Sequence, residues 1–587
     1  MLRPGKYFFL LLVFLSIKAT PQVVHSVYVE GKFNINKVDI ITWSGVEAGM
    51  KLYPEIIDSV KYRMASHLAR MGYLHSSFDG TEIIRYDTGS VNLIIKLDQG
   101  TPTYINSINI SGLDSTQKIH INTYFEYLKG EIFNKSELEN DIEQALTYFE
   151  NNGYPFAKIE IPSIYFYDDS LSGSYYADIS LNCKPGILSR IDRFEIIGNL
   201  KTQDYVILRE LRIMKGEIYS QKIIDELPKR LNLLGYFEPV EQPEFFLNSK
   251  NEGTLRIKVK EKETNNFDGV IGFIPATNNG QSGYLTGLVN VSLRNLFGTG
   301  RAAAINWQQY DRYSQNLEIK YLEPWFLGYP FNVLGSLFQR KQDSTYVQRK
   351  IEGSIEYLAT ETISASFNLS TESVIPTQNN SSVFTVYNSS AVTTGLNLKI
   401  DTRNDPYAPT EGVLFQNSYS YSKKKITGPA NYITPGMQTN ISLQRIALDI
   451  SAFYQVFSRQ IIAASFHGRE LRGSFFEVSD LYRLGGANTL RGYREDQFLG
   501  NRIFWTNLEY RFLLTRRTFG FLFLDTGYYL RNADAALNIE KNEGFNIGYG
   551  LGVNLETSLG VLRVSFALAK GDSFSDAKIH FGIVNEF

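Results

Sequence analysis

Arg491 stands near the centre of the stretch YRLGGANTLRGYRED (residues 482–496), and its guanidinium group is suited to a buried electrostatic contact. Gly485, Gly486 and Gly492 surround it, and glycine adopts backbone conformations that other residues avoid. The loop can therefore fold back sharply. An arginine that enters a protein interior needs carboxylate partners, and its planar group can bind two of them. The pattern predicts an anchoring contact and not a reaction.

Two carboxylates on the following segments are the candidate partners. Glu509 lies in NRIFWTNLEYRF and Asp525 lies in FLFLDTGYYL, and both segments alternate in the manner of strands. Side chains on a strand alternate between its two faces, so each carboxylate can point away from the apolar face of its strand. We predict that the loop tip, Arg491-Gly492-Tyr493, is pinned inside the protein by Asp525 and by Glu509.

No constellation for catalysis or metal binding is evident in the sequence. The single cysteine, Cys183, is expected to be a buried apolar residue. An enzyme built on strands would need a Ser–His or Asp–His pair on facing strands, and no partnered serine is evident near His467 or His580. The net charge of −2 gives no nucleic-acid footprint. We expect no enzyme, no cofactor, no metal and no nucleic-acid partner. The histidines form no ligand-spaced cluster: His25, His67, His75, His120, His467 and His580.

The first residues indicate export from the cytoplasm. Arg3 and Lys6 precede the apolar run YFFLLLVFLSI (7–17), which is too short to span a bilayer as a helix. We predict a signal peptide at residues 1–20. No run of about 20 apolar residues follows, but an exported chain can still cross a membrane as a closed barrel.

The N-terminal half contains an internal repeat. A helical pattern ends in Gly-Tyr three times, at Gly72, Gly153 and Gly235, with spacings of 81 and 82 residues, and each is followed by alternating strands. The predicted repeats are α+β units at residues 30–102, 103–186 and 187–262. In the second repeat, Ser136 and Glu139 have the spacing of a capping box that would begin an amphipathic helix.

Residues 263–587 read as an all-β barrel of about sixteen antiparallel strands, each roughly ten residues long with apolar residues outward. A soluble sandwich would alternate similarly, but the export signal and the strand lengths favour a membrane barrel. The last strand, AKIHFGIVNEF, ends on the aromatic Phe587 and must meet the first strand, FDGVIGFIP. Glycines and a proline weaken that first strand as a ladder partner. We therefore predict a seam marked by Val270, Ile583 and Phe587.

Four segments resemble motifs of the outer-membrane assembly-factor superfamily, which includes BamA, TamA and the two-partner secretion transporters. They are NLFGTGR (295–301), DTRNDPYAPTEG (401–412), GGANTLRGY (485–493) and FLDTG (523–527). Leu490 stands where the family often has valine. The N-terminal units resemble POTRA domains. Three such units look most like the TamA branch, because BamA usually carries five and the two-partner transporters two.

The resemblance implies a bacterial outer-membrane barrel with N-terminal domains in the periplasm. Its clients would be unfolded outer-membrane or secreted proteins, inserted into the lipid through a lateral seam between the first and last strands. An inner-membrane or periplasmic partner could bind the repeats. One alternative is a secretion pore that passes an exported polypeptide through its lumen. Another is an adhesive surface protein, for which the polar stretch 371–392 would be an external loop.

Overall fold

The computed structural model describes residues 22–87, 89–169, 173–274, 283–309, 311–342, 345–377, 386–406, 408–433, 435–533, 539–557 and 560–584. The predicted signal peptide at 1–20 lies outside these residues. The chain forms two compact units: one holds the first two repeats, and the other holds most of the third repeat and the barrel. Within the described ranges, no helix is long and apolar enough to cross a membrane.

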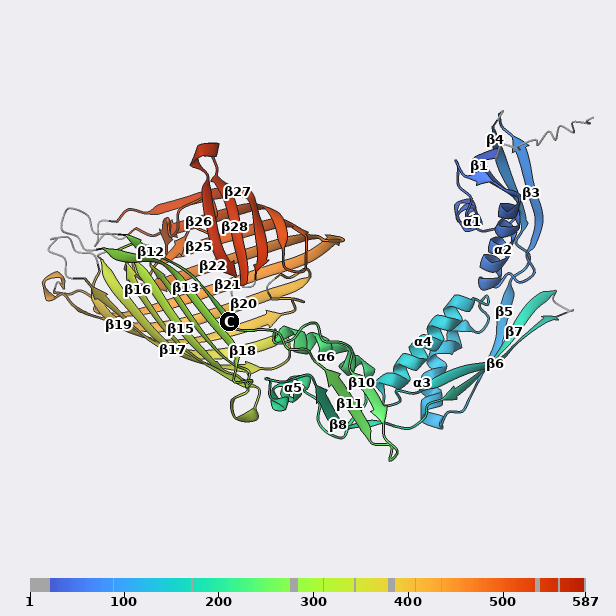
Figure 1. Ribbon diagram of the computed structural model, residues 1–587, viewed down its shortest axis with the longest axis horizontal. Helices are drawn as coiled ribbons and strands as arrows, with labels where there is room; N and C mark the ends of the chain where they lie inside the picture. Colours follow the sequence, from blue (N-terminus) through green and yellow to red (C-terminus); the bar gives the residue numbers. More distant parts are fainter. Residues whose placement is uncertain are drawn as a thin grey trace, which may run out of the picture. The chain divides into compact units, whose positions relative to one another are not determined.

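Each of the first two repeats packs two helices on one face of a sheet (Figure 1). The first sheet has the order β2-β1-β4-β3 and the second β5-β7-β6. The first repeat contains β1 (Gln22–Lys32), α1 (Lys37–Ser44), β2 (Lys51–Leu52), α2 (Pro54–Arg70), β3 (Ser77–Arg85) and β4 (Ser90–Asp98). The second contains β5 (Thr103–Ser111), α3 (Ser115–Phe125), α4 (Lys135–Asn151), β6 (Lys158–Asp169) and β7 (Ser174–Lys184).

Helix α4 begins at a different cap from the one predicted. Asn134 is the N-cap, and its side chain accepts hydrogen bonds from the backbone N–H groups of Ser136 and Glu137. The capping box at Ser136 and Glu139 is therefore wrong by two residues, because asparagine caps as well as serine and stands earlier. The helix ends as expected before Gly153, whose φ is 95°.

The third repeat forms a sheet of order β10-β11-β8-β9. Its glycine after the second helix, Gly235, again has a positive φ of 71°. The repeat contains β8 (Arg190–Ile197), α5 (Asp204–Leu211), β9 (Glu217–Ile218), α6 (Gln221–Leu233), β10 (Glu244–Leu247) and β11 (Gly253–Lys258). All three repeats thus share the order strand, helix, helix, strand, strand, and the first and third add a two-residue strand between their helices.

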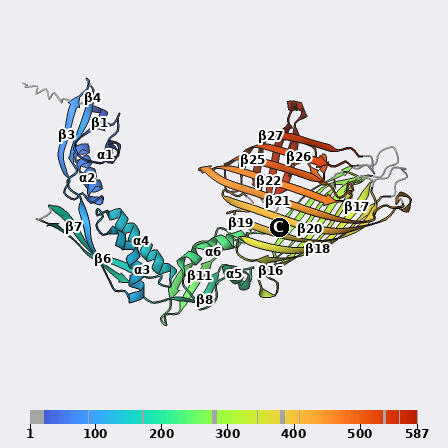
Figure 2. The ribbon, with the colours of Figure 1, turned by 180° about the vertical axis from the view of Figure 1, so that it is seen from behind.

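The barrel is a sheet of sixteen consecutive antiparallel strands (Figures 1 and 2), which confirms the predicted fold class. The strands are β12 (Asn266–Ile274), β13 (Tyr284–Leu296), β14 (Arg301–Gln309), β15 (Gln315–Glu323), β16 (Phe331–Gln342), β17 (Tyr346–Leu358), β18 (Ile363–Pro376), β19 (Asn388–Asp401), β20 (Gly412–Gly428), β21 (Asn440–Phe457), β22 (Gln460–Gly473), β25 (Arg502–Leu513), β26 (Phe519–Arg531), β27 (Asn542–Thr557), β28 (Gly560–Ala569) and β29 (Lys578–Val584).

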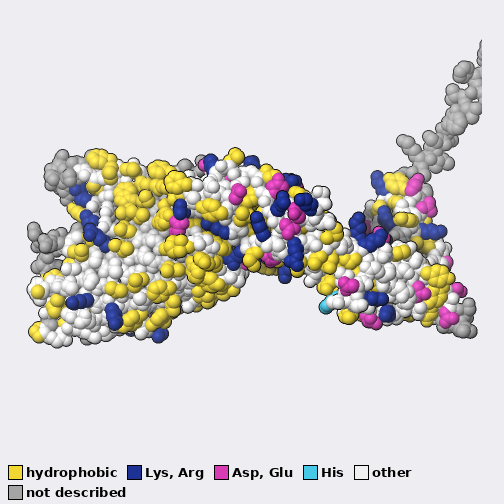
Figure 3. Space-filling model, turned by 90° about the horizontal axis from the view of Figure 1, so that it is seen from below, with side chains coloured by type: hydrophobic (Ala, Val, Ile, Leu, Met, Phe, Trp, Pro, Cys, Tyr) yellow, Lys and Arg dark blue, Asp and Glu magenta, His cyan; other side chains and the backbone are white. Residues whose placement is uncertain are grey.

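Side chains along the barrel strands alternate between an apolar outer face and an inner face. On β25, Leu508 and Tyr510 are exposed, whereas Glu509 between them is buried. On β26, Leu522 is exposed and Phe523 is buried. Hydrophobic side chains gather in broad areas over the outside of the barrel (Figure 3). This arrangement is typical of a barrel that faces lipid outside and polar groups inside.

Cys183 lies on β7 and is completely buried in the core of the second repeat. Burial raises the pKa of its thiol to about 11, because an apolar surrounding disfavours the thiolate. The thiolate is the species that reacts with disulfides and maleimides.

We expect Cys183 to resist a maleimide in the folded protein and to react once the chain is unfolded in urea. At about pH 8, a thiol with this pKa is ionised in only about one molecule in a thousand. The measurement is the labelling rate by mass spectrometry, with Glu139→Cys in a Cys183→Ser background as an exposed control. Equal rates for the two cysteines in the native protein would contradict the burial.

Candidate functional site

The segment between β22 and β25, here called the lumen loop (residues 474–501), folds into the barrel. It forms a short hairpin of β23 (Tyr482–Leu484) and β24 (Phe498–Gly500). Leu484 and Leu490 are fully buried and pack against Trp505 on β25. These contacts bring the tip of the loop to the inner wall of the barrel.

Arg491 makes its polar contacts with the two predicted carboxylates. Its Nε and Nη2 atoms donate to the two carboxylate oxygens of Asp525 at 2.8 Å and 2.7 Å, and its Nη1 donates to Glu509 at 2.8 Å. The backbone N–H of Arg491 also donates to Asp525 at 3.1 Å. The side chain of Arg491 is 3% exposed and that of Asp525 is 0% exposed. The loop tip is therefore held inside the protein by a bidentate ion pair with Asp525, a bond to Glu509 and a backbone bond to Asp525.

Glu509 is shared by three arginines, which the sequence analysis did not predict. Arg511 donates to it at 2.9 Å, and Arg563 on β28 lies 3.5 Å from it. The period of two residues along a strand puts Arg511 and Arg563 on the inner faces of their strands, but only the curvature of the folded sheet brings β28 close to the carboxylate on β25. The cluster contains three guanidinium groups and two carboxylates.

Three phenylalanines on β26 line up beside this cluster. The guanidinium carbon of Arg511 lies 5.0 Å from the ring of Phe519, and that of Arg491 lies 3.7 Å from the ring of Phe523. Arg563 lies 5.2 Å from the ring of Phe521. A cation over an aromatic face is attracted by the ring quadrupole, so these rings stabilise the excess positive charge.

Glycines allow the loop tip to approach the barrel wall closely. Gly485 and Gly486 have φ values of 119° and 105°, and a Cβ at Gly485 would lie 2.5 Å from the carbonyl oxygen of Arg494. A Cβ at Gly548 on β27 would lie 1.8 Å from the carbonyl oxygen of Arg491. A side chain at Gly548 would push the tip away from the wall, and one at Gly485 would disturb the fold of the loop itself.

The loop tip reaches beyond its two carboxylates to the last strands of the sheet. The Tyr493 hydroxyl donates to the carbonyl oxygen of Ile547 on β27 at 3.1 Å. The backbone N–H of Gly492 donates to Nε2 of His580 on β29 at 3.1 Å. The tripeptide predicted from the sequence thus contacts β25, β26, β27 and β29.

A second buried ion cluster holds the root of the lumen loop. The side chain of Lys424 on β20 is 3% exposed. Its Nζ lies 2.5 Å from a carboxylate oxygen of Glu477 and 2.7 Å from one of Asp480. Glu477 also accepts the backbone N–H of Tyr387 at 2.6 Å. The sequence showed these residues only as scattered charges, because Lys424 is more than fifty positions away from its partners.

The turn 401–412, one of the four resemblance motifs, also folds toward β26. Arg403 binds Asp401 through two hydrogen bonds of 2.9 Å and 2.8 Å. Asp405 forms an ion pair of 3.2 Å with Arg517 in the turn between β25 and β26. Ala408 packs on the phenylalanines of β26. The loop tip and this turn therefore share one aromatic surface.

The turn 295–301 binds the third repeat. The backbone N–H of Gln203 donates to the carbonyl oxygen of Gly298 at 2.9 Å, and Asn295 donates to the Thr202 hydroxyl at 2.8 Å. A Cβ at Gly298 would lie 1.8 Å from the carbonyl oxygen of Lys201. A glycine is required where two backbones meet this closely.

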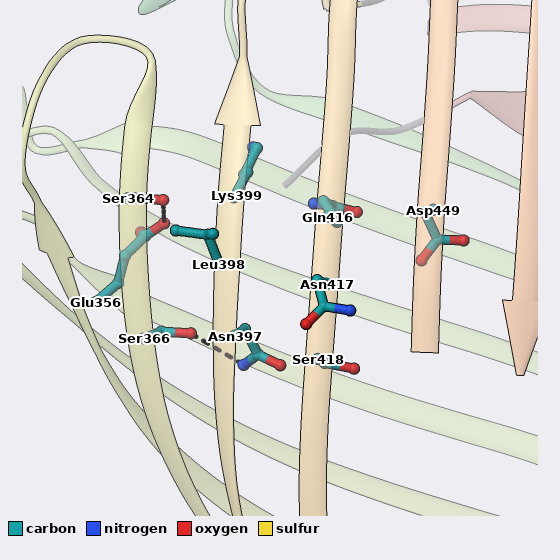
Figure 4. Close-up of a pocket in the computed structure, with 10 residues that line it drawn as sticks. All are labelled: Glu356, Ser364, Ser366, Asn397, Leu398, Lys399, Gln416, Asn417, Ser418 and Asp449. Atoms are coloured by element: carbon teal, nitrogen blue, oxygen red, sulfur yellow. Dashed lines mark hydrogen bonds between the residues drawn. The ribbon is translucent and has the colours of Figure 1, made fainter. Parts of the chain in front are cut away.

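The inner wall from β17 to β21 is polar. A cavity of about 280 Å³ lies here. Figure 4 shows the side chains that line it, among them Glu356, Ser364, Asn397 and Asp449. The Ser364 hydroxyl donates to Glu356 at 2.6 Å. Such a wall suits water or an unfolded polypeptide better than an apolar ligand.

One pair in this wall departs from the expectation about histidines. Nδ1 of His467 lies 2.5 Å from Asp449, on the neighbouring strand, so an Asp–His pair on facing strands does exist. Asp449 is also bound by Arg469 at 2.8 Å, and the His467 ring stacks on Trp505 with the ring centroids 4.6 Å apart. Asp449 and His467 are therefore both engaged in structural contacts beside the lumen loop.

The predicted seam residues lie at the two ends of the strand order. Val270 lies on β12, paired with Leu288, and Ile583 lies on β29, paired with Leu562. Phe587 lies outside the described residues. Among those described, no group of three or more His, Cys, Asp or Glu residues is arranged to hold a metal ion.

We expect Arg491→Ala to lower the free energy of unfolding by about 3–5 kcal/mol, because it leaves two buried carboxylates without their shared partner. Arg491→Lys should fall between this variant and the parent, since an ammonium group cannot form the bidentate pair. The measurement is urea unfolding in lipid vesicles, followed by tryptophan fluorescence.

Arg494→Ala is the matched control for Arg491, because Arg494 lies in the same loop with its side chain exposed. It should unfold like the parent protein. An equal loss of stability in the two alanine variants would contradict the ion-pair account.

Gly298→Ala should loosen the third repeat from the barrel, because the added Cβ meets the backbone of Lys201. Gly328→Ala is the control: its φ of 82° is also left-handed, but open space surrounds the position. We expect faster tryptic cleavage at Lys260 and Lys262 in the first variant only. Equal cleavage in both variants would show that backbone strain alone, and not the contact, is responsible.

Models of two known protein families match most of the chain. The Omp85 superfamily domain matches residues 295–587. The surface antigen variable number repeat, a POTRA unit, matches residues 103–178 and 189–262.

Individual relatives are named as assembly factors. The outer membrane protein assembly factor BamA of Nitratidesulfovibrio vulgaris is 21% identical over 475 residues, covering 76% of this chain and 56% of that protein. BamA of Neisseria meningitidis serogroup B is 30% identical over 179 residues, covering 29% and 21%. The chain thus spans about half or less of these relatives. The crystal structure of Haemophilus ducreyi BamA lacking POTRA domains 1–3 is 17% identical, with a TM-score of 0.49 and coverage of 81% and 98%.

Proposed function

The chain belongs to the Omp85 superfamily and carries POTRA domains, and we propose that it assembles client β-barrel proteins in the outer membrane of a bacterium. In this proposal the barrel lies in the membrane and the three repeats extend into the periplasm. The observation that carries the proposal is the barrel itself, with an apolar outside and the lumen loop docked against its last strands. Relatives named as outer membrane protein assembly factors support it.

The working surface in this proposal is the seam between β12 and β29. These strands stand at the two ends of the pairing order, and no pairing between them occurs within the described ranges. Within the described residues, β29 pairs with β28 over seven positions. In β12, a Cβ at Gly269 would lie 2.7 Å from the carbonyl oxygen of Leu288. A client strand could pair with such an edge and then move into the lipid. No covalent bond changes in this process, so no enzyme activity and no cofactor are required.

The repeats are the proposed receiving surface for unfolded outer-membrane or secreted clients. β3 and β6 are edge strands of their sheets. Ile83 and Tyr165 on these edges are 41% and 64% exposed. An extended peptide can add to such an edge through backbone hydrogen bonds, with apolar side chains giving affinity. An inner-membrane or periplasmic partner would use the same repeats.

The finer assignment is to the TamA branch of the superfamily. Three repeats support it, with the predicted boundaries 30–102, 103–186 and 187–262. The relatives reported above carry the BamA name. The assignment to the TamA branch therefore rests on the repeat count alone, whereas the assignment to the superfamily rests on the family matches.

A secretion pore is the second candidate, and the polar wall with its cavity favours it. A polypeptide could pass through the lumen only if both the lumen loop and the turn 401–412 moved aside. The seam proposal needs no such clearance, because the client leaves sideways.

A disulfide across the seam tests the two candidates. We would place cysteines at Val270 and Ile583 in a Cys183→Ser background and measure client assembly in vesicles before and after reduction. If the seam must open, the oxidised protein should lose nearly all assembly, and reduction should restore it. If assembly is unaffected while a secreted chain still passes, the pore takes the place of the insertase.

The control disulfide joins two strands that stay paired. Leu508 and Leu524 are directly opposite each other on β25 and β26, and both face outward. Opposite positions of neighbouring strands have Cα separations that suit a disulfide. Cysteines there should cross-link without stopping assembly, which separates seam closure from any general effect of oxidation.

A further inference from the structure

His580 lies on β29, the strand that forms one side of the seam, and its side chain turns toward the lumen loop. Its Nε2 accepts the backbone N–H of Gly492 at 3.1 Å. Nε2 can accept only when it carries no proton, so this bond assigns the ring proton of a neutral imidazole to Nδ1. His580 was recognised in the sequence only as a barrel histidine without a catalytic partner.

The same loop tip is also fixed to β25 and β26, at the far side of the five neighbouring strands β25 to β29. Arg491, next to Gly492, binds Asp525 on β26 and Glu509 on β25. Gly492 itself passes close to β28, since a Cβ there would lie 2.7 Å from the carbonyl oxygen of Leu568. One short peptide therefore runs along the inner wall from β25 to the seam strand.

We propose that His580 is a positioning residue that ties β29 to the tip of the lumen loop, so that seam opening and loop release are coupled. The tie itself is a property of the barrel, and its use in client insertion rests on the proposed function. When β29 moves outward, either the Gly492–His580 bond breaks or the loop tip must follow. Because coupling is reciprocal, a loosened loop must also loosen β29.

The position of β29 at the end of the strand order explains why one hydrogen bond can matter. Within the described residues, β29 has backbone pairing with β28 over seven positions. Lys578, at its start, forms a 2.7 Å ion pair with Asp572 in the preceding turn. The charged groups near the His580 ring are Arg491, Asp525 and Lys578. Of these, Arg491 belongs to the loop tip and Asp525 to its anchor.

Hydrogen–deuterium exchange of the full-length protein in lipid vesicles, without any client, tests the tie. Two peptides report on it: one that covers the loop tip at 488–494 and one that covers β29 at 578–584. His580→Leu removes the acceptor at similar volume. His580→Gln keeps an oxygen at about the place of Nε2, and His580→Asn places it too near the backbone.

We expect His580→Leu and His580→Asn to raise exchange in both peptides on the order of fivefold, the effect of losing one hydrogen bond. His580→Gln should resemble the parent protein in both. If His580→Leu fails to fold, the comparison of Asn with Gln still decides the matter. Lys578→Gln is the control: it removes the ion pair with Asp572 but keeps the tie, so exchange in the loop peptide should rise far less than in His580→Leu.

Three results would overturn the tie. The first is faster exchange of β29 in His580→Leu with an unchanged loop peptide. The second is a Gln variant that behaves like Leu. The third is a loop response to Lys578→Gln equal to that of His580→Leu. Since no client is present, failure of the client-assembly experiment would leave this test intact, and a negative result here would leave the seam disulfide test intact.

Discussion

The interior of this barrel depends on the burial of one guanidinium group. A charge inside a protein loses its hydration, and only well-placed carboxylates and aromatic faces compensate for that loss. Arg491 has both, with Asp525 and Glu509 at 2.7–2.8 Å and the ring of Phe523 at 3.7 Å. Because these groups belong to β25 and β26, the contact fixes the lumen loop at one place on the wall. That position requires glycines around Arg491, because the backbone of the loop passes too close to its neighbours for a Cβ atom.

The aromatic surface of β26 joins two motifs that are far apart in the sequence. Arg491 and Arg563 approach its rings from the loop and from β28, and Ala408 packs on the same rings from the turn 401–412. Asp405 and Arg517 hold that turn in place. The lumen loop and the turn 401–412 therefore both contact β26, the strand that carries Asp525, and this strand links the two motifs physically.

Much of the fold could be predicted from local patterns. Alternation along the strands indicated sixteen barrel strands, and Gly72, Gly153 and Gly235 marked the repeats, since both features depend on residues close in sequence. The pairing of Arg491 with Asp525 and Glu509 was also within reach, because parity along a strand places each carboxylate on the inner face. The cap of α4 was misplaced, because Asn134 and Ser136 are both good capping residues and sequence alone does not rank their geometry.

By itself, the sequence determined the order of repeats and barrel, the outer and inner faces of each strand, and the residue types able to anchor a loop. Only the tertiary structure decided which distant groups meet. Arg563 reaches Glu509, Lys424 reaches Asp480, and His580 reaches Gly492, because the curvature of the sheet and the inward fold of the lumen loop bring together groups that are far apart along the chain. A period of two residues specifies a face of a strand, but it carries no information about what lies across the lumen from that face.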